Sequence, residues 1–544
     1  MQNSIGVGHV SVTNGITAAG TLNVTGKAVV GGNVEGDMTI DGAGAVVSIH
    51  GTLDDGAQSG GLGGLSVTGS GAKLAIDNDW IIGDAGTHTD SIIRGSGGVS
   101  TDTVGGTLTL GNQGSGVGSL TISGTSQALT AGKDVIVGGA GTGTLMVENG
   151  GSLLVSGGVV NVGTAGGGGS LDVGFNAFVT AVVSQVGGVG RLSLAGGIFD
   201  ATTLTVQGEV SGFGSFTGIT ENDGIVKANG GTLVLQKAVT GTGSLSILAG
   251  ATLDLGGASS TGQTVTFNGS GLTLEQAHVT SATLSGFGAG SVIDVKGVVA
   301  ADRSFSGGVL TLFDATSAVI ETLKFSDAFV TQNFVIASDG GTGTAVTYAP
   351  CFAAGTRIAT DSGELAVEQL RAGDLVRAAS GSLVAIKWIG TRRMTRLHEH
   401  PEQSAVQPLC VAKGALAQGC PARDLMLSPD HALLLEGKLI PVKALINGRS
   451  IRQLSWAEVT YFHVELPQHD ILLAEGAEVE SYLDTGNSSA FDNFGPAVQL
   501  YPEFCARSYD IRRYAPFAEQ GVAVEAARRA ILARVEEAAT ELAA

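Results

Sequence analysis

Glycine is very unevenly distributed along this chain, because 74 of its 87 glycines lie in residues 1–350. In this half a short phrase recurs, in which Leu, Val or Ile alternates with Ser or Thr until a glycine or asparagine follows. Alternation with a period of two predicts β-strands, and glycine and asparagine accept the positive φ of tight turns. The phrases are GTLTLG (106–111), GSLTISG (118–124), GTLMVENG (143–150), GSLLVSGG (151–158), GSLDVG (169–174), GRLSLAGG (190–197), GTLVLQ (231–236) and GSLSILAG (243–250).

Repetition of this strand-and-turn unit predicts stacked turns of a solenoid rather than a closed sandwich. The expected fold is all-β, beginning with a long right-handed parallel β-helix-like solenoid over residues 1–290. Capping and connecting strands are expected over residues 291–348, because an open last turn would expose unpaired strand edges. A β-roll and a partly disordered glycine-rich linker are the alternatives. The segment GGLGGLSVT (60–68) lacks the aspartate of a calcium-binding nonapeptide, so no calcium is expected.

The phrases resemble the passenger-associated repeats of bacterial autotransporters and related adhesins. This resemblance implies a secreted or cell-surface protein whose solenoid makes cell-surface or carbohydrate contacts. The histidines of this half (His9, His50, His88 and His278) are isolated in the sequence. The sequence therefore gives no support to a catalytic site, such as a pectinolytic one, on the solenoid.

A different kind of sequence begins at Cys351, and it holds all four cysteines of the chain. Charged residues become frequent and glycine becomes ordinary. Three segments carry the pattern: CFAAGTRIATDSGELAVEQLRAGDLVRA from residue 351, LMLSPDHALLL (425–435) and TYFHVELPQHDILLAEGAEVESYLDTGN (460–487). In this order and spacing they resemble blocks A, B and F of the Hint domains of hedgehog proteins and inteins, over residues 349–487.

The resemblance implies autocatalytic peptide cleavage in cis, not turnover of an external substrate. Cys351 would attack the carbonyl carbon of Pro350 and form a thioester, since a thiol is nucleophilic enough to do so without a metal. Ser428 would hydrogen-bond the scissile amide and help to distort it, and His431 would protonate the leaving amine. His469 matches the block F histidine. Water, an external thiol or another nucleophile would then resolve the thioester. The alternatives are a buried strand cysteine at 351 and core histidines at 431 and 469; His463 is a weaker catalytic candidate than His469.

Splicing is not expected, because Glu480 and Ser481 stand where inteins carry His and Asn. The proline before the cysteine should slow thioester formation, since its carbonyl is crowded and already engaged by the preceding oxygen. The leading hypothesis is therefore N-terminal cleavage that releases the solenoid. A structural adhesin-like protein with an inactive or very slow Hint domain is the alternative, and a carrier for a C-terminal toxin is a third.

The net charge of −20 argues against nucleic-acid binding, which needs a basic surface. No apolar run is long enough to span a bilayer, and no signal peptide is visible at the N-terminus. No cofactor or metal is expected; the pair His398 and His400 resembles two metal ligands but lacks an evident third. The tail, residues 488–544, should hold an amphipathic helix over 523–542.

Overall fold

The computed structural model describes residues 2–481 and 514–543 apart from short gaps, and it divides the chain into two compact units. One unit comprises residues 1–246 and 251–264, and the other residues 247–250 and 265–544. The gaps are residues 6–9, 13–15, 18–20, 31–35, 42–43, 61, 69–70, 94–99, 126, 249, 258–261, 269–270, 275–280, 289–290, 327–328, 330–333, 340, 349–350, 396, 398–406, 517 and 519–520.

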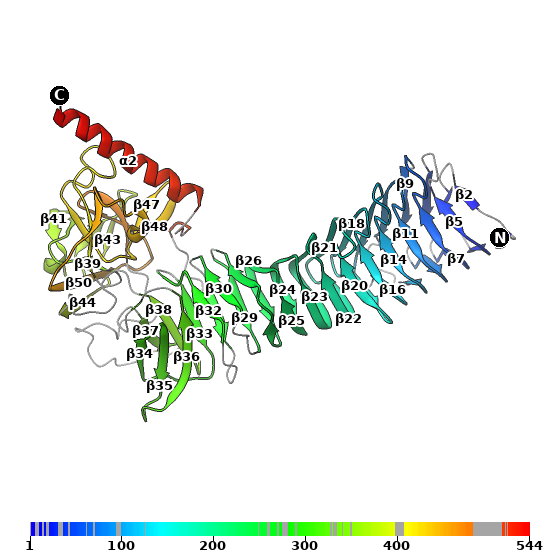
Figure 1. Ribbon diagram of the computed structural model, residues 1–544, viewed down its shortest axis with the longest axis horizontal. Coiled ribbons are helices and arrows are strands. Elements are labelled where there is room, and N and C mark those ends of the chain that lie inside the picture. The colour runs from blue at the N-terminus through cyan, green and yellow to red at the C-terminus, as the bar shows by residue number, and fades with distance from the viewer. Residues whose placement is uncertain are drawn as a thin grey trace. The chain divides into compact units, whose positions relative to one another are not determined.

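The first unit is a parallel β-solenoid in which the chain coils through three stacks of strands (Figure 1). The first stack is β1 (Gln2–Ile5), β4 (Thr21–Val24), β7 (Val46–Ile49), β10 (Lys73–Ile76), β13 (Ser100–Val104), β16 (Gln127–Ala131) and β19 (Ser152–Val155). The second is β2 (Val10–Val12), β5 (Ala28–Val30), β8 (Leu53–Asp55), β11 (Trp80–Ile82), β14 (Leu108–Leu110), β17 (Val135–Val137) and β20 (Val159–Val162). The third is β3 (Ile16–Thr17), β6 (Gly36–Ile40), β9 (Leu62–Val67), β12 (Thr87–Ile93), β15 (Val117–Ser123), β18 (Thr142–Glu148) and β21 (Gly169–Val173).

Four of the recurring phrases form the same strand in successive turns of the coil. Leu120, Leu145, Leu171 and Leu192 stand in register and are all buried, so each turn covers the apolar row of the turn before it. The glycines that begin these phrases also stand in register, at positions 118, 143, 169 and 190. A Cβ at Gly118 would lie 2.0 Å from the carbonyl oxygen of Ile82, so no larger residue fits this close approach. Glycine is therefore abundant because the corners of the coil are tight.

The coil becomes shorter after β21, where strands merge. Hydrogen bonds between neighbouring turns join residues 25 apart at Ser152 and Gln127, but only 16 apart at Thr205 and Glu221. The single strand β22 pairs with both β19 and β20, so one corner of the coil is lost. The strands of this part are β22 (Phe178–Val186), β23 (Gly190–Val206), β24 (Glu209–Phe216), β25 (Ile219–Asn222), β26 (Ile225–Leu235), β27 (Val239–Thr240), β28 (Ser244–Ile247) and β29 (Thr252–Leu255).

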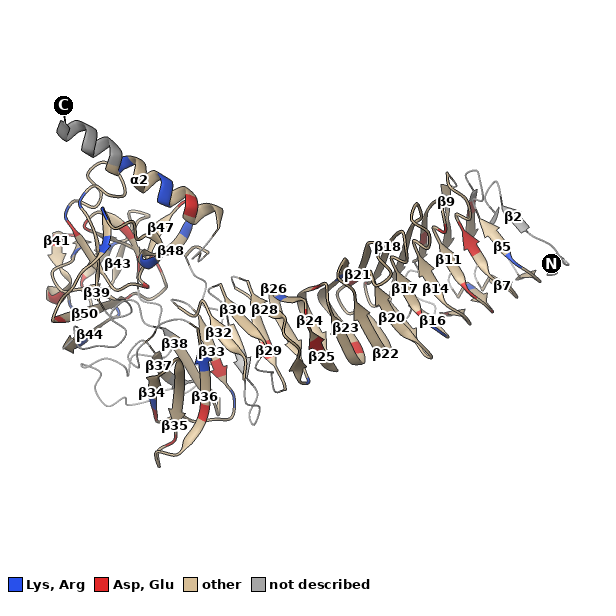
Figure 2. Cartoon of the chain, in the orientation of Figure 1, with Lys and Arg blue, Asp and Glu red and all other residues tan. Residues whose placement is uncertain are grey.

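Charged side chains are sparse along the stacked strands, as Figure 2 shows. Some pair between neighbouring turns: Lys27 contacts Asp54 at 2.5 Å, and Lys227 contacts Glu209 at 3.0 Å. Inside the coil, the carboxyl groups of Asp55 and Asp90 are buried and interact with each other. The Trp80 indole N–H donates to Asp55 Oδ2 at 2.7 Å. Burial raises the pKa of Asp90 to about 6 and that of Asp55 well above its usual value, so the pair holds a proton that exposed aspartates would release.

This acid pair predicts that the solenoid loses stability as the pH rises. An unfolded aspartate releases its proton near pH 4, whereas the folded pair keeps one. The stabilisation is therefore fully present below about pH 4 and lost as the pH rises through about 6. Asp55→Asn should raise the free energy of unfolding more at pH 7.5 than at pH 4.5, and so flatten its pH dependence. Thermal unfolding of the full chain at pH 4.5 and 7.5, with exposed Asp41→Asn as control, measures this; an equal effect of Asp55→Asn at both pH values would contradict it.

The second unit begins with strands that change from parallel to antiparallel pairing. Strand β33 pairs in parallel with β31 and antiparallel with β38, and β34 to β36 form an antiparallel meander. Six phenylalanines pack with ring centroids 5.1–6.3 Å apart: Phe267, Phe287, Phe305, Phe325, Phe329 and Phe334. The strands are β30 (Thr264–Phe267), β31 (Gly271–Leu274), β32 (Thr283–Ser285), β33 (Val292–Val295), β34 (Asp302–Ser306), β35 (Val309–Phe313), β36 (Val319–Phe325), β37 (Phe334–Ser338) and β38 (Thr344–Tyr348).

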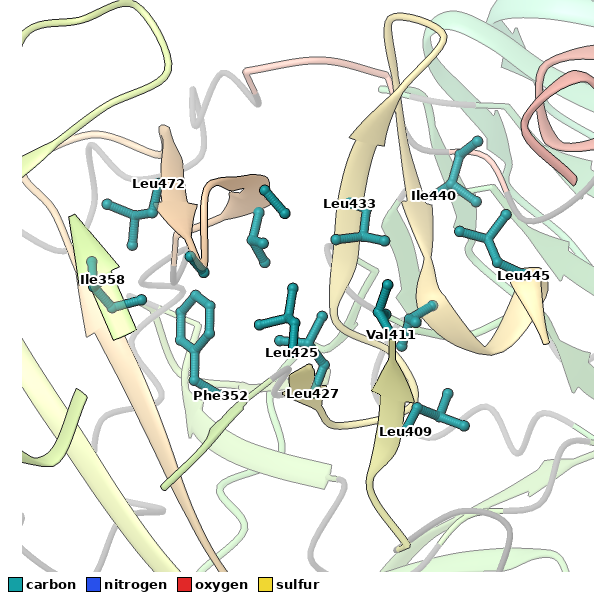
Figure 3. Close-up of a cluster of buried hydrophobic side chains, with 14 of the residues drawn as sticks. Phe352, Ile358, Leu409, Val411, Leu425, Leu427, Leu433, Ile440, Leu445 and Leu472 are labelled. Carbon is teal, nitrogen blue, oxygen red and sulfur yellow. The ribbon is translucent and has the colours of Figure 1, made fainter. Parts of the chain in front are cut away.

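A separate β domain follows from Cys351, with two sheets around one apolar core. The sheet orders are β44-β50-β39-β46-β45-β49 and β43-β42-β40-β51-β52-β47-β48, with β41 paired to β40. Figure 3 shows Phe352, Leu425 and Leu427 close together in this core. The elements are β39 (Phe352–Ala353), β40 (Arg357–Thr360), β41 (Gly363–Ala366), η2 (Val367–Gln369), β42 (Leu375–Arg377), β43 (Leu383–Ala385), β44 (Trp388–Thr395), β45 (Leu409–Val411), β46 (Leu425–Leu427), β47 (Ala432–Leu435), β48 (Lys438–Pro441), η4 (Val442–Leu445), β49 (Ile451–Gln453), β50 (Glu458–Glu465), β51 (Ile471–Ala474), β52 (Ala477–Glu480) and α2 (Val522–Ala543).

The expected all-β fold with a parallel solenoid and a short C-terminal helix is confirmed. Helix α2 covers Val522–Ala543, an alanine-rich segment with high helix propensity. In the part of the chain that the structure describes, no helix has the length and apolar character needed to cross a membrane.

Candidate active site

The short strand β39 places Cys351 between two longer strands. Phe352 pairs with Leu427 of β46 on one side and with Phe462 of β50 on the other. Cys351, one residue earlier, is only 3% exposed. It therefore meets Ser428, which follows β46, and His463 of β50.

Ser428 forms two hydrogen bonds with the backbone of Cys351, one as acceptor and one as donor. The Cys351 N–H donates to Ser428 Oγ at 2.7 Å, and the Ser428 N–H donates to the Cys351 carbonyl at 2.9 Å. The Cys351 N–H is the leaving nitrogen of the predicted cleavage. The Ser428 hydroxyl therefore lies at the nitrogen of Cys351, where the resemblance to Hint domains implied that it would be.

His431 is held beside Ser428 by a turn over residues 428–431. The His431 N–H donates to the Ser428 carbonyl at 3.1 Å, and Pro429 supplies the fixed φ that suits the second position of a turn. The imidazole is buried, with its ring centroid 4.3 Å from that of Phe352. Its Nε2 lies 3.0 Å from the Glu480 carbonyl oxygen, which can only accept, so Nε2 carries a proton. Among the described residues, Nδ1 has no hydrogen-bond partner.

The thiol of Cys351 faces His463. The distance between Sγ and His463 Nε2 is 2.7 Å, and both side chains are buried. Burial raises the pKa of the thiol to about 12, against a smaller opposing effect of Arg392. Burial also lowers the pKa of His463 well below its usual value, and His431 and Arg392 act in the same direction. At neutral pH the thiol is therefore protonated and the imidazole is neutral, and the S–H donates to Nε2 in the tautomer whose ring proton is on Nδ1.

His469 occupies a different place from the one its match to block F implied. Its buried Nε2 lies 3.6 Å from Glu480 Oε2, and its Nδ1 accepts from the Tyr514 N–H at 3.2 Å. Both ring nitrogens thus face groups other than the thiol, and His463 holds the contact with Cys351. From the sequence alone, His469 is the stronger catalytic candidate, because the strand register that sets residue 463 beside residue 351 is not visible there. A histidine within the apolar run TYFHVEL was the available signal.

The remaining predicted residues lie apart from this cluster or outside the described residues. Pro350, the predicted cleavage position, and the pair His398 and His400 are outside them. Cys410 and Cys420 are free thiols in the C-terminal β domain. Over the described residues, no group of three or more His, Cys, Asp or Glu side chains is arranged to hold a metal ion.

Comparison with known proteins agrees with this geometry. Residues 350–486 match the family model of the Hint domain. A search of curated proteins found no match to the chain. The chain therefore carries a Hint domain, in addition to its parallel β-helix-like solenoid.

Proposed function

We propose that the Hint domain cleaves the chain before Cys351 by an N-to-S acyl shift and so releases residues 1–350. The contact between Cys351 Sγ and His463 Nε2, at 2.7 Å, is the observation that carries this proposal. A thiol with a pKa near 12 is almost never ionised at neutral pH, so it needs a base in contact to become a nucleophile. His463, kept neutral by burial, can accept the proton.

In the first step His463 takes the thiol proton while Sγ forms a bond to the carbonyl carbon of Pro350. The carbonyl oxygen becomes an oxyanion. When it collapses, the bond between this carbon and the Cys351 nitrogen breaks, and a thioester remains. The nitrogen leaves with one hydrogen and needs a second, which balances the proton that the thiol gave up.

Ser428 and His431 serve the leaving nitrogen. Ser428 Oγ is already hydrogen-bonded to it at 2.7 Å and can pass a proton to its lone pair once the nitrogen becomes pyramidal, while the proton that His463 took from the thiol returns to the hydroxyl. The turn closed by the hydrogen bond from the His431 N–H to the Ser428 carbonyl holds these two residues together. Water or an external thiol then attacks the thioester, which frees the solenoid and regenerates the Cys351 thiol.

The residue at the position of the intein C-terminal junction supports cleavage without splicing. Ser481 stands where an intein carries its cyclising asparagine, and its Oγ accepts from the Asp470 N–H at 2.9 Å. A serine has no side-chain amide nitrogen with which to form a succinimide. The second, C-terminal cut of an intein therefore has no residue to perform it at this position.

A structural protein with a silent Hint domain is the second candidate. The burial of Cys351, whose side chain would have to be reached by the resolving nucleophile, favours it. In that case the solenoid and the Hint domain would stay joined, and the contact between Cys351 and His463 would serve only packing.

Gel electrophoresis of the purified full chain separates the two candidates. Cleavage predicts fragments of 350 and 194 residues that appear faster with dithiothreitol, since a thiol resolves the thioester. The fold should be monitored in parallel by circular dichroism. A chain that remains folded and intact in dithiothreitol over days would exclude the cleavage proposal.

A further inference from the structure

We infer that residues 514–516, 518 and 521–531, which lie beyond the family-model match, are part of the processing domain and position His431 through His469 and Glu480. The effect on cleavage rests on the function proposed above, whereas the structural part of the inference does not. His469 is on this account a positioning residue, and the tail sets its orientation.

The tail covers a sheet edge of the domain. Strand β48 is the last in its sheet order, so its outer backbone groups have no strand partner there. The Leu439 N–H donates to the Pro516 carbonyl, and the Ala518 N–H donates to the Leu439 carbonyl, both at 2.9 Å. Exposed edges attract unwanted pairing, and this segment satisfies the β48 edge at Leu439. Its removal would leave both groups of Leu439 without these partners.

Apolar contacts and one further hydrogen bond fasten the same segment. Ala515 is buried against Ala432, Leu439 and Ile471. On α2, the residues at positions 524, 527 and 531 are buried in the main core of the domain, which is the spacing of one helix face. The Arg528 Nε–H donates to the Ala444 carbonyl at 2.6 Å. The helix is therefore bound to the domain along its first turns.

The hydrogen-bond directions between the tail and His431 are fixed by groups that can only donate or only accept. The Tyr514 backbone N–H can only donate, so His469 Nδ1 is unprotonated and Nε2 carries the ring proton. That proton faces Glu480 Oε2 at 3.6 Å. Glu480 Oε1 accepts from the Ala432 N–H at 2.8 Å, next to His431 in the chain.

Glu480 connects His469 to the candidate active site. Its carbonyl accepts the Nε2–H of His431 at 3.0 Å, which leaves Nδ1 of the neutral ring as the acceptor. Glu480 thus contacts His469 through its side chain and sets the tautomer of His431 through its backbone carbonyl. Without the Tyr514 N–H, His469 could turn its other nitrogen to Glu480, and of the side-chain contacts named here Glu480 would keep only the one with the Ala432 N–H.

The test compares chains that end at residue 513 with chains that end at residue 535, each with Cys351 and with Cys351→Ala. The chain ending at 535 keeps every contact named above and is the matched control. In the Cys351→Ala pair, hydrogen exchange of residues 438–441 should be at least tenfold faster without the tail. In the pair that retains Cys351, cleavage should slow at least tenfold, and a synthetic peptide of residues 510–535 should restore it.

Full-length His469→Gln and His469→Phe keep the inference testable if the shorter chain fails to fold. Glutamine retains a donor for Glu480, so it should cleave within about threefold of wild type, whereas phenylalanine should lose at least tenfold. Unchanged exchange at 438–441 without the tail, or equal rates for both variants, would overturn the inference. If exchange changes as expected but no chain cleaves, the proposed function fails and the structural role of the tail stands.

Discussion

Replacing Cys351 with alanine is expected to leave the full chain intact under conditions in which the wild type cleaves. Alanine has no nucleophile, and Ser428 Oγ is engaged by the amide nitrogen that would leave. Loss of a covalent nucleophile costs at least about a thousandfold in rate, which is complete loss on a gel. The rate of appearance of the 194-residue fragment measures the effect.

Cys410→Ala is the matched control, because Cys410 is also a buried thiol in a strand of the same domain. It removes a similar volume from a neighbouring part of the fold and should leave the cleavage rate within about twofold of the wild type. Fragments of the same size from Cys351→Ala would show that another group breaks the chain.

The second large effect is expected for His463→Gln. Removal of a positioned general base costs about 10²–10⁴ in rate. The pH dependence should change as well, since the wild type keeps its base neutral at and above neutral pH. Without the base, the rate should depend on the small thiolate fraction and rise about tenfold per pH unit toward the thiol pKa of about 12.

His50→Gln provides the control for histidine loss, because His50 is half exposed on the solenoid and pairs with Asp77. Its pH profile should overlay that of the wild type. A His463→Gln profile parallel to the wild type, only lower, would indicate that His463 acts through packing and is not the base.

Much of the fold followed from local patterns. The phrases at 118–124, 143–150, 169–174 and 190–197 predicted strands because their alternation is a property of each strand alone, and they prove to be one strand repeated in register. The boundary between the glycine-rich part and the β domain at Cys351 was also visible, because the glycine content falls there. The contact of Cys351 with Ser428 was implied by the resemblance to Hint domains.

Other features depend on contacts that no local pattern reveals. His463 rather than His469 reaches the thiol because Phe352 pairs with Phe462, a register between segments 110 positions apart. The role of Tyr514 depends on a backbone amide, which every residue but proline possesses. The acid pair of Asp55 and Asp90 joins residues of different turns of the coil, and the sequence shows only two ordinary aspartates.

The most direct test of the central claim is the intact mass of the N-terminal fragment made in the presence of hydroxylamine. A thioester at Pro350 is captured by hydroxylamine, so residues 1–350 should carry a C-terminal hydroxamate and the other fragment should begin with an unmodified Cys351. A fragment that ends at any other residue, or one that ends at Pro350 as a free acid whatever the hydroxylamine concentration, would contradict the proposed acyl shift.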